Sequence, residues 1–286
     1  MKKIKYFLEF LIISSLFIIY KFFGLKISSY ISGKLFETFG PIFRSKNLIK
    51  TNIQRAIPKI NSSRIKIITK DMWNNYGRTL SEYMFIKGFR NDQFQSNINI
   101  EGKEVLQKIS NEKTPVIFVS GHLGNFELMA MEIEKSGVNL SAIYRPLNNI
   151  FLNLIMERIR RKYICRNQIK KGTSGVRELL RLYKKGYSIA LMIDQRVSQG
   201  IKSKFFDEEA FTTTIPAQFI KKFNCKVVPI SIKRYNGVNF NIKIENPMEF
   251  SKSSSTEKIT RELNIWLEKT ILKNPGEWIW SHDRWK

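Results

Sequence analysis

Short apolar runs alternate with longer amphipathic segments over most of this chain, and this alternation restricts its fold more than any other feature. The runs have the length and composition of buried strands, and the segments between them have helical periodicity. The predicted strands span residues 98–101, 115–119, 140–144, 188–193, 226–232 and 240–244. The predicted helices span residues 104–110, 126–135, 150–162, 174–186, 215–223 and 256–272. Strands separated by helices favour parallel pairing, so we predict an α/β fold with a mixed, mostly parallel central sheet flanked by helices. Residues 194–213 are predicted to form a loop.

The N-terminal third has a different pattern. Three lysines within the first five residues precede an apolar stretch from about Phe7 to Leu25, close to the roughly 20 residues that a membrane-spanning helix needs. Its uncharged centre is shorter, so a helix lying in the membrane interface is an alternative. A cleaved signal peptide is another, but no small-residue cleavage site follows. We predict three parts: an N-terminal membrane-anchor helix (1–26), a helical membrane-proximal segment (27–97) and an α/β domain (98–286).

The charge of the chain limits its partners. It contains 49 Lys and Arg residues against 24 Asp and Glu residues, a formal net charge of +25. Nucleic acid, an anionic membrane surface and an acidic protein or ligand all suit this charge, although a lysine-rich proteome would also explain part of it. The two cysteines, Cys165 and Cys225, have neither disulfide-framework nor zinc-site spacing, which favours a reducing, cytosol-facing location. No metal site and no cofactor are indicated.

One histidine stands where a strand is predicted to turn into a helix. His122 lies between Gly121 and Gly124, and Glu127 follows five positions later. A histidine oriented by a carboxylate suits general-base catalysis near neutral pH. Five helical residues separate side chains by about 140°, so the two could meet only if His122 precedes the first helical turn. We predict that Glu127 fixes the tautomer of His122. Alternatively, His122 is a structural turn residue and Glu127 an ordinary acid at a helix N-terminus.

This stretch, Gly121-His122-Leu-Gly-Asn-Phe-Glu127, resembles the His-x4-acid motif of glycerolipid-type acyltransferases. The whole chain resembles their lipid A branch, the lauroyl/myristoyl acyltransferases that add the late, secondary chains. Further matching segments are Trp73-x2-Tyr76-Gly77-Arg78-x3-Glu82-Tyr83, Tyr144-Arg145-Pro146, Asp194-Gln195, Phe205-Phe206, Thr212-Thr213-Thr214-x-Pro216-Ala217, Val228-Pro229 and Trp278-Ile-Trp280-Ser-His282-x-Arg284-Trp285.

The resemblance implies a reaction, a location and partners. A fatty acyl chain would pass from an acyl-carrier-protein thioester to a hydroxyl of a lipid A precursor, with His122 deprotonating that hydroxyl for direct attack. The domain at residues 98–286 would be the acyltransferase domain, on the cytoplasmic face of a bacterial inner membrane. The implied partners are the acyl-carrier protein, the lipid A precursor and the anionic membrane.

Six further residues are candidates for substrate binding. The backbone N–H groups of Gly124 and Asn125 are placed to stabilise negative charge on the carbonyl oxygen. Arg145 and Arg160 are candidates for binding an acceptor phosphate or the oxyanion, because a guanidinium binds such groups bidentately. The remaining two, at a strand end where open α/β sheets place their sites, would shape the pocket or bind the acceptor: Asp194 and Gln195.

Other functions remain alternatives. The acceptor could be another glycolipid or a lysophospholipid. A basic nucleic-acid-binding protein suits the charge but leaves the apolar stretch and the His–Glu turn without a role, so we expect no nucleic-acid partner. A non-catalytic membrane scaffold would tolerate replacement of both His122 and Glu127.

Overall fold

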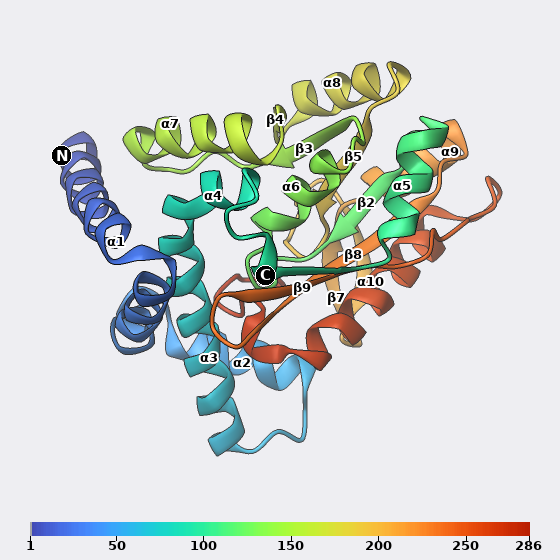
Figure 1. The fold of residues 1–286 in the computed structure, drawn as a ribbon. Coiled ribbons are helices and arrows are strands. Elements are labelled where there is room, and N and C mark those ends of the chain that lie inside the picture. Colours follow the sequence, from blue (N-terminus) through green and yellow to red (C-terminus); the bar gives the residue numbers. More distant parts are fainter. Residues whose placement is uncertain (1) are drawn as a thin grey trace.

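A seven-stranded sheet forms the centre of the computed structural model, which describes residues 2–286 (Figure 1). The strand order is β1-β9-β8-β2-β5-β3-β4. The strand bounds are β1 (Ile98–Glu101), β2 (Ile117–Ser120), β3 (Leu140–Tyr144), β4 (Asn167–Lys170), β5 (Ser188–Met192), β8 (Val227–Tyr235) and β9 (Asn239–Ile244). Strands β8, β2, β5, β3 and β4 are parallel to one another, whereas β9 is antiparallel to β8 and parallel to β1. The prediction of a mixed, mostly parallel sheet flanked by helices is confirmed.

Helices cover both faces of this sheet. Their bounds are α1 (Lys2–Phe39), α2 (Lys46–Ala56), α3 (Ser62–Glu82), α4 (Ile86–Arg90), α5 (Lys103–Glu112), α6 (Glu127–Lys135), α7 (Ile150–Ile159), α8 (Thr173–Lys184), α9 (Ile215–Phe223) and α10 (Thr256–Lys273), with short helical turns η1 (Gly40–Ile42), η2 (Tyr83–Phe85), η3 (Gln95–Asn97), η4 (Arg160–Ile164) and η5 (Pro275–Glu277). Alternate residues of β2 enter two separate cores: Phe118 packs with residues of α5 and α6, and Val119 packs with residues of α3, α9 and α10. Successive strand residues point to opposite faces, so the sheet is buried on both sides.

Two segments differ from the sequence prediction. Residues 201–212, predicted as a loop, form a hairpin of β6 (Ile201–Phe205) and β7 (Glu208–Thr212) outside the main sheet. Alternate residues of this hairpin are buried, among them Phe205 and Ala210, but the buried Ser203 and Thr212 are polar and hide the apolar alternation. Strand β4 was not predicted because it is a short, mostly polar edge strand.

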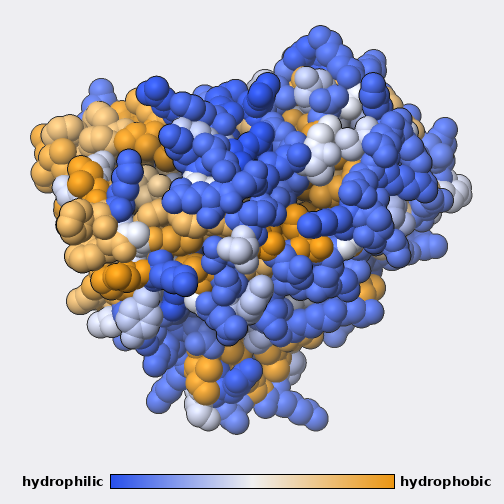
Figure 2. Space-filling model, in the orientation of Figure 1, coloured by the Kyte–Doolittle hydropathy of each residue, from blue (hydrophilic) through white to orange (hydrophobic). Residues whose placement is uncertain are grey.

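Helix α1 is bent into two halves at Gly24, which has a positive φ of 76°. The half after Gly24 packs closely on α3: a Cβ at Gly77 would lie 2.3 Å from the carbonyl oxygen of Ser32. The half before Gly24 leaves many apolar side chains exposed, and Figure 2 shows them as a continuous apolar surface on the left of the molecule. By length and composition, α1 could cross a membrane.

The register of two central strands brings distant residues together. Strands β2 and β5 are parallel neighbours, and Ser120 pairs with Met192 at their carboxyl ends. His122 follows Ser120 by two residues, and Asp194 follows Met192 by two residues. The two side chains therefore reach the same edge of the sheet, where open α/β sheets place their sites.

Candidate active site

His122 is held by Asp194. The Nδ1 atom of His122 lies 2.8 Å from Oδ1 of Asp194, and the backbone N–H of His122 donates to Oδ2 at 2.9 Å. Trp278 donates its indole N–H to the same Oδ2 at 2.9 Å. A carboxylate can only accept these bonds, so Nδ1 carries the proton and Nε2 has the free lone pair of the neutral ring. Nε2 makes no hydrogen bond within residues 2–286, which leaves it available to a substrate hydroxyl.

Burial makes this pair electrostatically strong. The Asp194 side chain is only 2% exposed and that of His122 is 19% exposed. Burial alone would raise the pKa of Asp194, but the His122 ring, the His122 backbone N–H and the Trp278 indole outweigh it and lower that pKa to about 2. Burial opposes protonation of His122, yet Asp194 outweighs it and raises the pKa of the ring above its ordinary value. The carboxylate thus stabilises the imidazolium that forms when His122 accepts a proton.

Glu127 does not make the predicted hydrogen bond to His122. At the first residue of α6, its Oε1 accepts hydrogen bonds from Arg160 Nη2 of η4 at 2.5 Å and from the Tyr83 hydroxyl of η2. Because the turn directs both the ring and the backbone N–H of His122 toward the end of β5, Asp194 takes the place that we predicted for Glu127. Glu127 is still near enough to contribute to the raised pKa of His122.

Arg160, which we predicted to bind an acceptor phosphate or the oxyanion, lies beside Glu127 at the start of η4. Its Nε and Nη2 atoms bind Glu127, Nη2 also binds the hydroxyl of Tyr83, and the guanidinium lies 5.9 Å from the ring centre of Tyr144. The Nη1 atom makes no hydrogen bond within the described residues. Arg160 therefore has a fixed orientation and one end free for an anionic group.

The turn after His122 rests on a buried ion pair that the sequence analysis did not assign to the site. The carbonyl of Gly124 accepts hydrogen bonds from Asn75 and Thr79 on α3. Asn125 donates to Glu82, which is fully buried and pairs with Arg234 of β8 at 2.5 Å. Glu82 was noted only as part of a matching motif, and no local pattern in the sequence connects it with Arg234.

Breaking this ion pair is expected to destabilise the fold. Arg234→Met leaves the Glu82 carboxylate buried without its cation, which should lower the free energy of unfolding by about 3–5 kcal/mol. The exposed pair Arg181–Glu178 provides a matched control, because solvent screens this pair and Arg181→Met should change the free energy of unfolding far less. Denaturant unfolding in detergent would measure both; equal losses would contradict a special role for the buried pair.

The C-terminal segment closes one side of the site. Trp278 bonds to Asp194, and Leu123 forms an isolated β-bridge with Trp278. His282 accepts a hydrogen bond through Nε2 from the backbone N–H of Arg196. The carbonyl of His282 accepts a second bond from Asn52. The second histidine thus ties the chain end to the segment that follows β5.

Glu277 packs behind the turn, because a Cβ at Gly124 would lie 2.9 Å from its Oε2 atom. Burial raises the pKa of Glu277 to about 7, although the backbone N–H of Arg234 bonds to it. Because the pKa of this acid is higher in the folded than in the unfolded protein, the folded protein loses stability as the pH rises from the unfolded-state pKa, near 4.5, through the folded-state pKa. The free energy of unfolding should fall by at most something on the order of 3 kcal/mol between about pH 5 and about pH 8, and Glu277→Gln should remove this fall. Unfolding curves at both pH values test this; an unchanged pH slope would contradict it.

The other residues that we predicted to bind substrate do not all lie beside His122 and Arg160. Arg145 is exposed and makes no hydrogen bond within residues 2–286, and it lies near Lys171 rather than in the Glu127–Arg160 cluster. Gln195 is half-buried beside Asp194 and makes no side-chain hydrogen bond among these residues. The backbone N–H groups of Gly124 and Asn125 are not used in hydrogen bonds within the described chain. No group of three or more potential metal ligands occurs within residues 2–286.

Comparisons with known proteins place this chain in a family. A family model described as bacterial lipid A biosynthesis acyltransferase matches residues 1–286. The chain belongs to this family. Among curated relatives, the lipid A biosynthesis acyltransferase of Haemophilus influenzae is 21% identical over 246 residues, covering 85% of this chain and 78% of the relative. The lipid A biosynthesis myristoyltransferase of Escherichia coli is 20% identical over 254 residues, covering 87% and 76%. The lipid A biosynthesis acyltransferase 2 of Shigella flexneri is 20% identical over 233 residues, covering 80% and 74%. The protein is therefore an acyltransferase, as the sequence resemblance predicted.

Proposed function

We propose that this acyltransferase moves a fatty acyl chain from an acyl-carrier-protein thioester to a hydroxyl of a lipid A precursor. The family and the printed activities of its relatives support the lipid A acceptor. The observation that carries the chemistry is the geometry of His122, whose Nδ1 is held by Asp194 while Nε2 is free. The apolar helix α1 supports a membrane location. We place the protein at a bacterial inner membrane with its α/β domain facing the cytoplasm.

In the proposed reaction, Nε2 of His122 removes the proton of the acceptor hydroxyl as its oxygen attacks the thioester carbonyl. Asp194 holds the ring in the required tautomer and stabilises the imidazolium, as the aspartate of a catalytic triad does. The tetrahedral intermediate then re-forms the carbonyl and expels the thiolate, which takes the proton from His122. An ester and a free carrier thiol result, and no nucleophile of the protein takes part.

The negative charge on the carbonyl oxygen needs donors. The backbone N–H groups of Gly124 and Asn125 supply candidates directly after the base. Arg160 offers its free Nη1 to this oxygen or to an acceptor phosphate, while Glu127 and Tyr83 keep its guanidinium oriented. We thus assign Glu127 to positioning Arg160, and Asp194 rather than Glu127 to orienting the base.

The acceptor is tested by competition in vitro. The full-length protein in mixed micelles receives one acyl-carrier-protein donor and equal amounts of a lipid A precursor and a lysophospholipid, and mass spectrometry measures both products. We expect acylated lipid A precursor to dominate. Preferential acylation of the lysophospholipid would refute the proposed acceptor but not the proposed reaction mechanism. Coenzyme A thioesters in parallel reactions test the donor in the same way.

Mass spectrometry of lipid A from cells with and without the protein is the matching test in vivo. Loss of one secondary acyl chain in its absence is the expected result. Lipid A of unchanged mass would contradict the proposal.

A further inference from the structure

Exposed apolar side chains gather in two segments of this protein. Of the 23 exposed large apolar residues within residues 2–286, 16 lie between Ile4 and Phe43, and three lie between Leu147 and Leu154. The first segment is α1 with η1, and the second leads into α7. Contiguous exposed apolar surface of this kind marks a protein or membrane interface. Membrane anchoring by α1 accounts for the first segment only.

The start of α7 is fixed against the start of α1. The Phe151 ring lies 5.5 Å from that of Phe7 and 5.9 Å from that of Phe10, centre to centre. Asn149 donates to the carbonyl oxygen of Tyr6 at 2.8 Å and to the carboxylate of Glu9 at 3.1 Å. Consequently the N-terminal end of α7 must be close to any membrane that receives the first half of α1.

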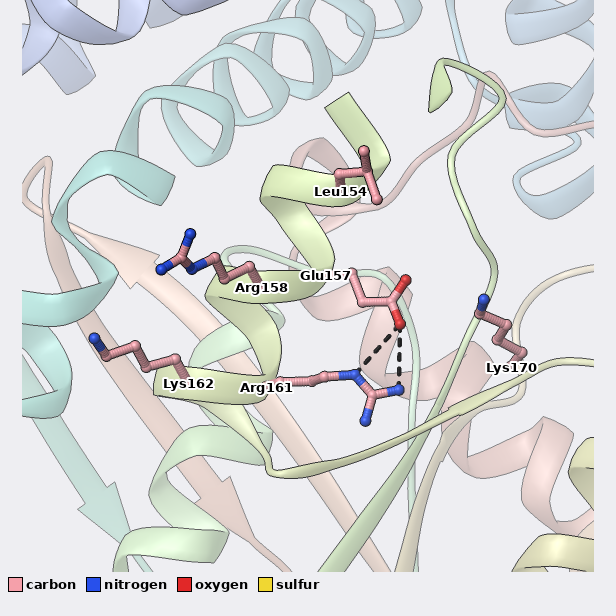
Figure 3. A pocket seen from close by; sticks show the side chains of 6 residues that line it. All are labelled: Leu154, Glu157, Arg158, Arg161, Lys162 and Lys170. Carbon is pink, nitrogen blue, oxygen red and sulfur yellow. Dashed lines mark hydrogen bonds and ion pairs between the residues drawn. The ribbon is translucent and has the colours of Figure 1, made fainter. Parts of the chain in front are cut away.

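The other end of α7 is strongly basic. An open cavity of about 630 Å³ lies here, and Figure 3 shows the six residues that line it: Leu154, Glu157, Arg158, Arg161, Lys162 and Lys170. Glu157 is the only acid among them and pairs with Arg161 at 3.2 Å. Arg158, Lys162 and Lys170 form no ion pair within the described residues, so the cavity has three uncompensated positive charges.

The order of these residues along the helix matches a bilayer surface. Arg158 follows Leu154 by four residues on one side of α7, and Lys162 lies four residues further on, in η4. At 1.5 Å per residue, the exposed Leu154 (70%) and Arg158 lie about 6 Å apart along the helix axis, so an apolar and a basic contact with a bilayer surface are adjacent. An acidic protein partner would match the charge but not the exposed Ile150 and Leu154 beside it.

We propose that α7 docks into the bilayer beside the first half of α1, and that the basic cavity binds the phosphate groups of anionic lipids. This inference rests on the proposed membrane location, and it is independent of the acyl donor and acceptor. Because α7 continues directly into η4, docking also holds the segment that carries Arg160. The ligand is thus a lipid phosphate monoester or diester at the membrane surface.

Site-specific labelling tests the docking. The full-length Leu154→Cys variant is labelled with an environment-sensitive fluorophore and reconstituted into phosphatidylcholine–phosphatidylglycerol vesicles. Cys165 and Cys225 are buried, so the label reacts with the introduced cysteine alone. We expect blue-shifted emission and quenching by lipid-borne nitroxides. Lys221→Cys on α9, which lies across the molecule from α7 in Figure 1, should remain in water. Equal, aqueous emission from both sites would overturn the proposal.

The charge requirement is tested in the same labelled protein. Arg158→Gln with Lys162→Gln should reduce the ratio of docked to undocked probe by roughly 30-fold, from about 1 kcal/mol for each basic residue near an anionic surface. Lys221→Gln with Lys222→Gln removes the same charge elsewhere and should change nothing. If the first pair leaves docking intact and instead weakens saturation by an acidic carrier protein, the cavity is a protein site and the proposal is wrong.

A final comparison identifies the source of the phosphate. Vesicles of phosphatidylcholine alone, with phosphatidylglycerol, or with a lipid A precursor separate bulk lipid from acceptor. If phosphatidylglycerol supports docking, the bound phosphate belongs to bulk lipid head groups. If only the lipid A precursor supports docking, the bound phosphate belongs to the acceptor. Docking that is equal in neutral phosphatidylcholine vesicles would refute the proposed binding of anionic lipid head groups. Inactivating His122 should not alter any of these readings, so failure of the proposed reaction and failure of docking are distinguishable.

Discussion

Replacing His122 by alanine is expected to lower the rate of acyl transfer by about a hundred- to ten-thousand-fold, because the reaction loses its general base. The protein should remain folded and membrane-bound, since the residue lies on a turn that Glu82, Asn75 and Thr79 support independently. Turnover of a purified acceptor by the variant in micelles measures the effect. Near-normal turnover would remove His122 from the mechanism.

The other histidine supplies the control. His282→Gln preserves an acceptor for the N–H of Arg196 and should cause a much smaller loss. The pH dependence adds a second test of the base. Only neutral His122 can accept the proton, and Asp194 raises its pKa above 6.5 against the effect of burial, so activity should rise with pH through a value above 6.5. Activity that falls with pH over this range would contradict the assignment.

Asp194→Asn is expected to be at least as damaging, on the order of ten-thousand-fold by analogy with the same change in a catalytic triad. An amide can donate to Nδ1 and stabilise the wrong tautomer, and it cannot stabilise the imidazolium. Glu127→Gln keeps a polar partner for Arg160 and should have a smaller effect. If Glu127→Gln abolishes transfer while Asp194→Asn retains it, Glu127 orients the base after all.

The lowered pKa of Asp194 also predicts a contribution to the stability of the fold that is lost in acid. Its folded pKa of about 2 lies below the ordinary value of 3.8, so this stabilisation is fully present above about pH 4 and is lost as pH falls toward 2. The shift corresponds to something on the order of 2 kcal/mol. Asp194→Asn should flatten the fall in unfolding free energy over this range; an unchanged acid slope would show that other groups cause it.

Local patterns in the sequence were sufficient for the fold class and for part of the site. The alternation of apolar runs and helical segments predicted the α/β architecture, and the glycine-bracketed histidine marked the turn after β2. Asp194 was selected because it follows a predicted strand, and Arg160 because arginine binds anions. These inferences depend on each residue's immediate neighbours and on general chemistry, both of which a sequence displays.

Only the tertiary structure decided which carboxylate meets the histidine. Glu127 was the nearest acid along the chain, but Asp194, 72 positions away, forms the bond because β2 and β5 pair in register. Strand order and register result from side-chain packing across the whole sheet, which no local periodicity records. Glu82 and Arg234, 152 positions apart, form their buried ion pair because the fold brings the end of α3 to β8. The sequence by itself thus determined that a histidine stands at the edge of an α/β sheet, and the pairing of distant strands determined which carboxylate holds its ring.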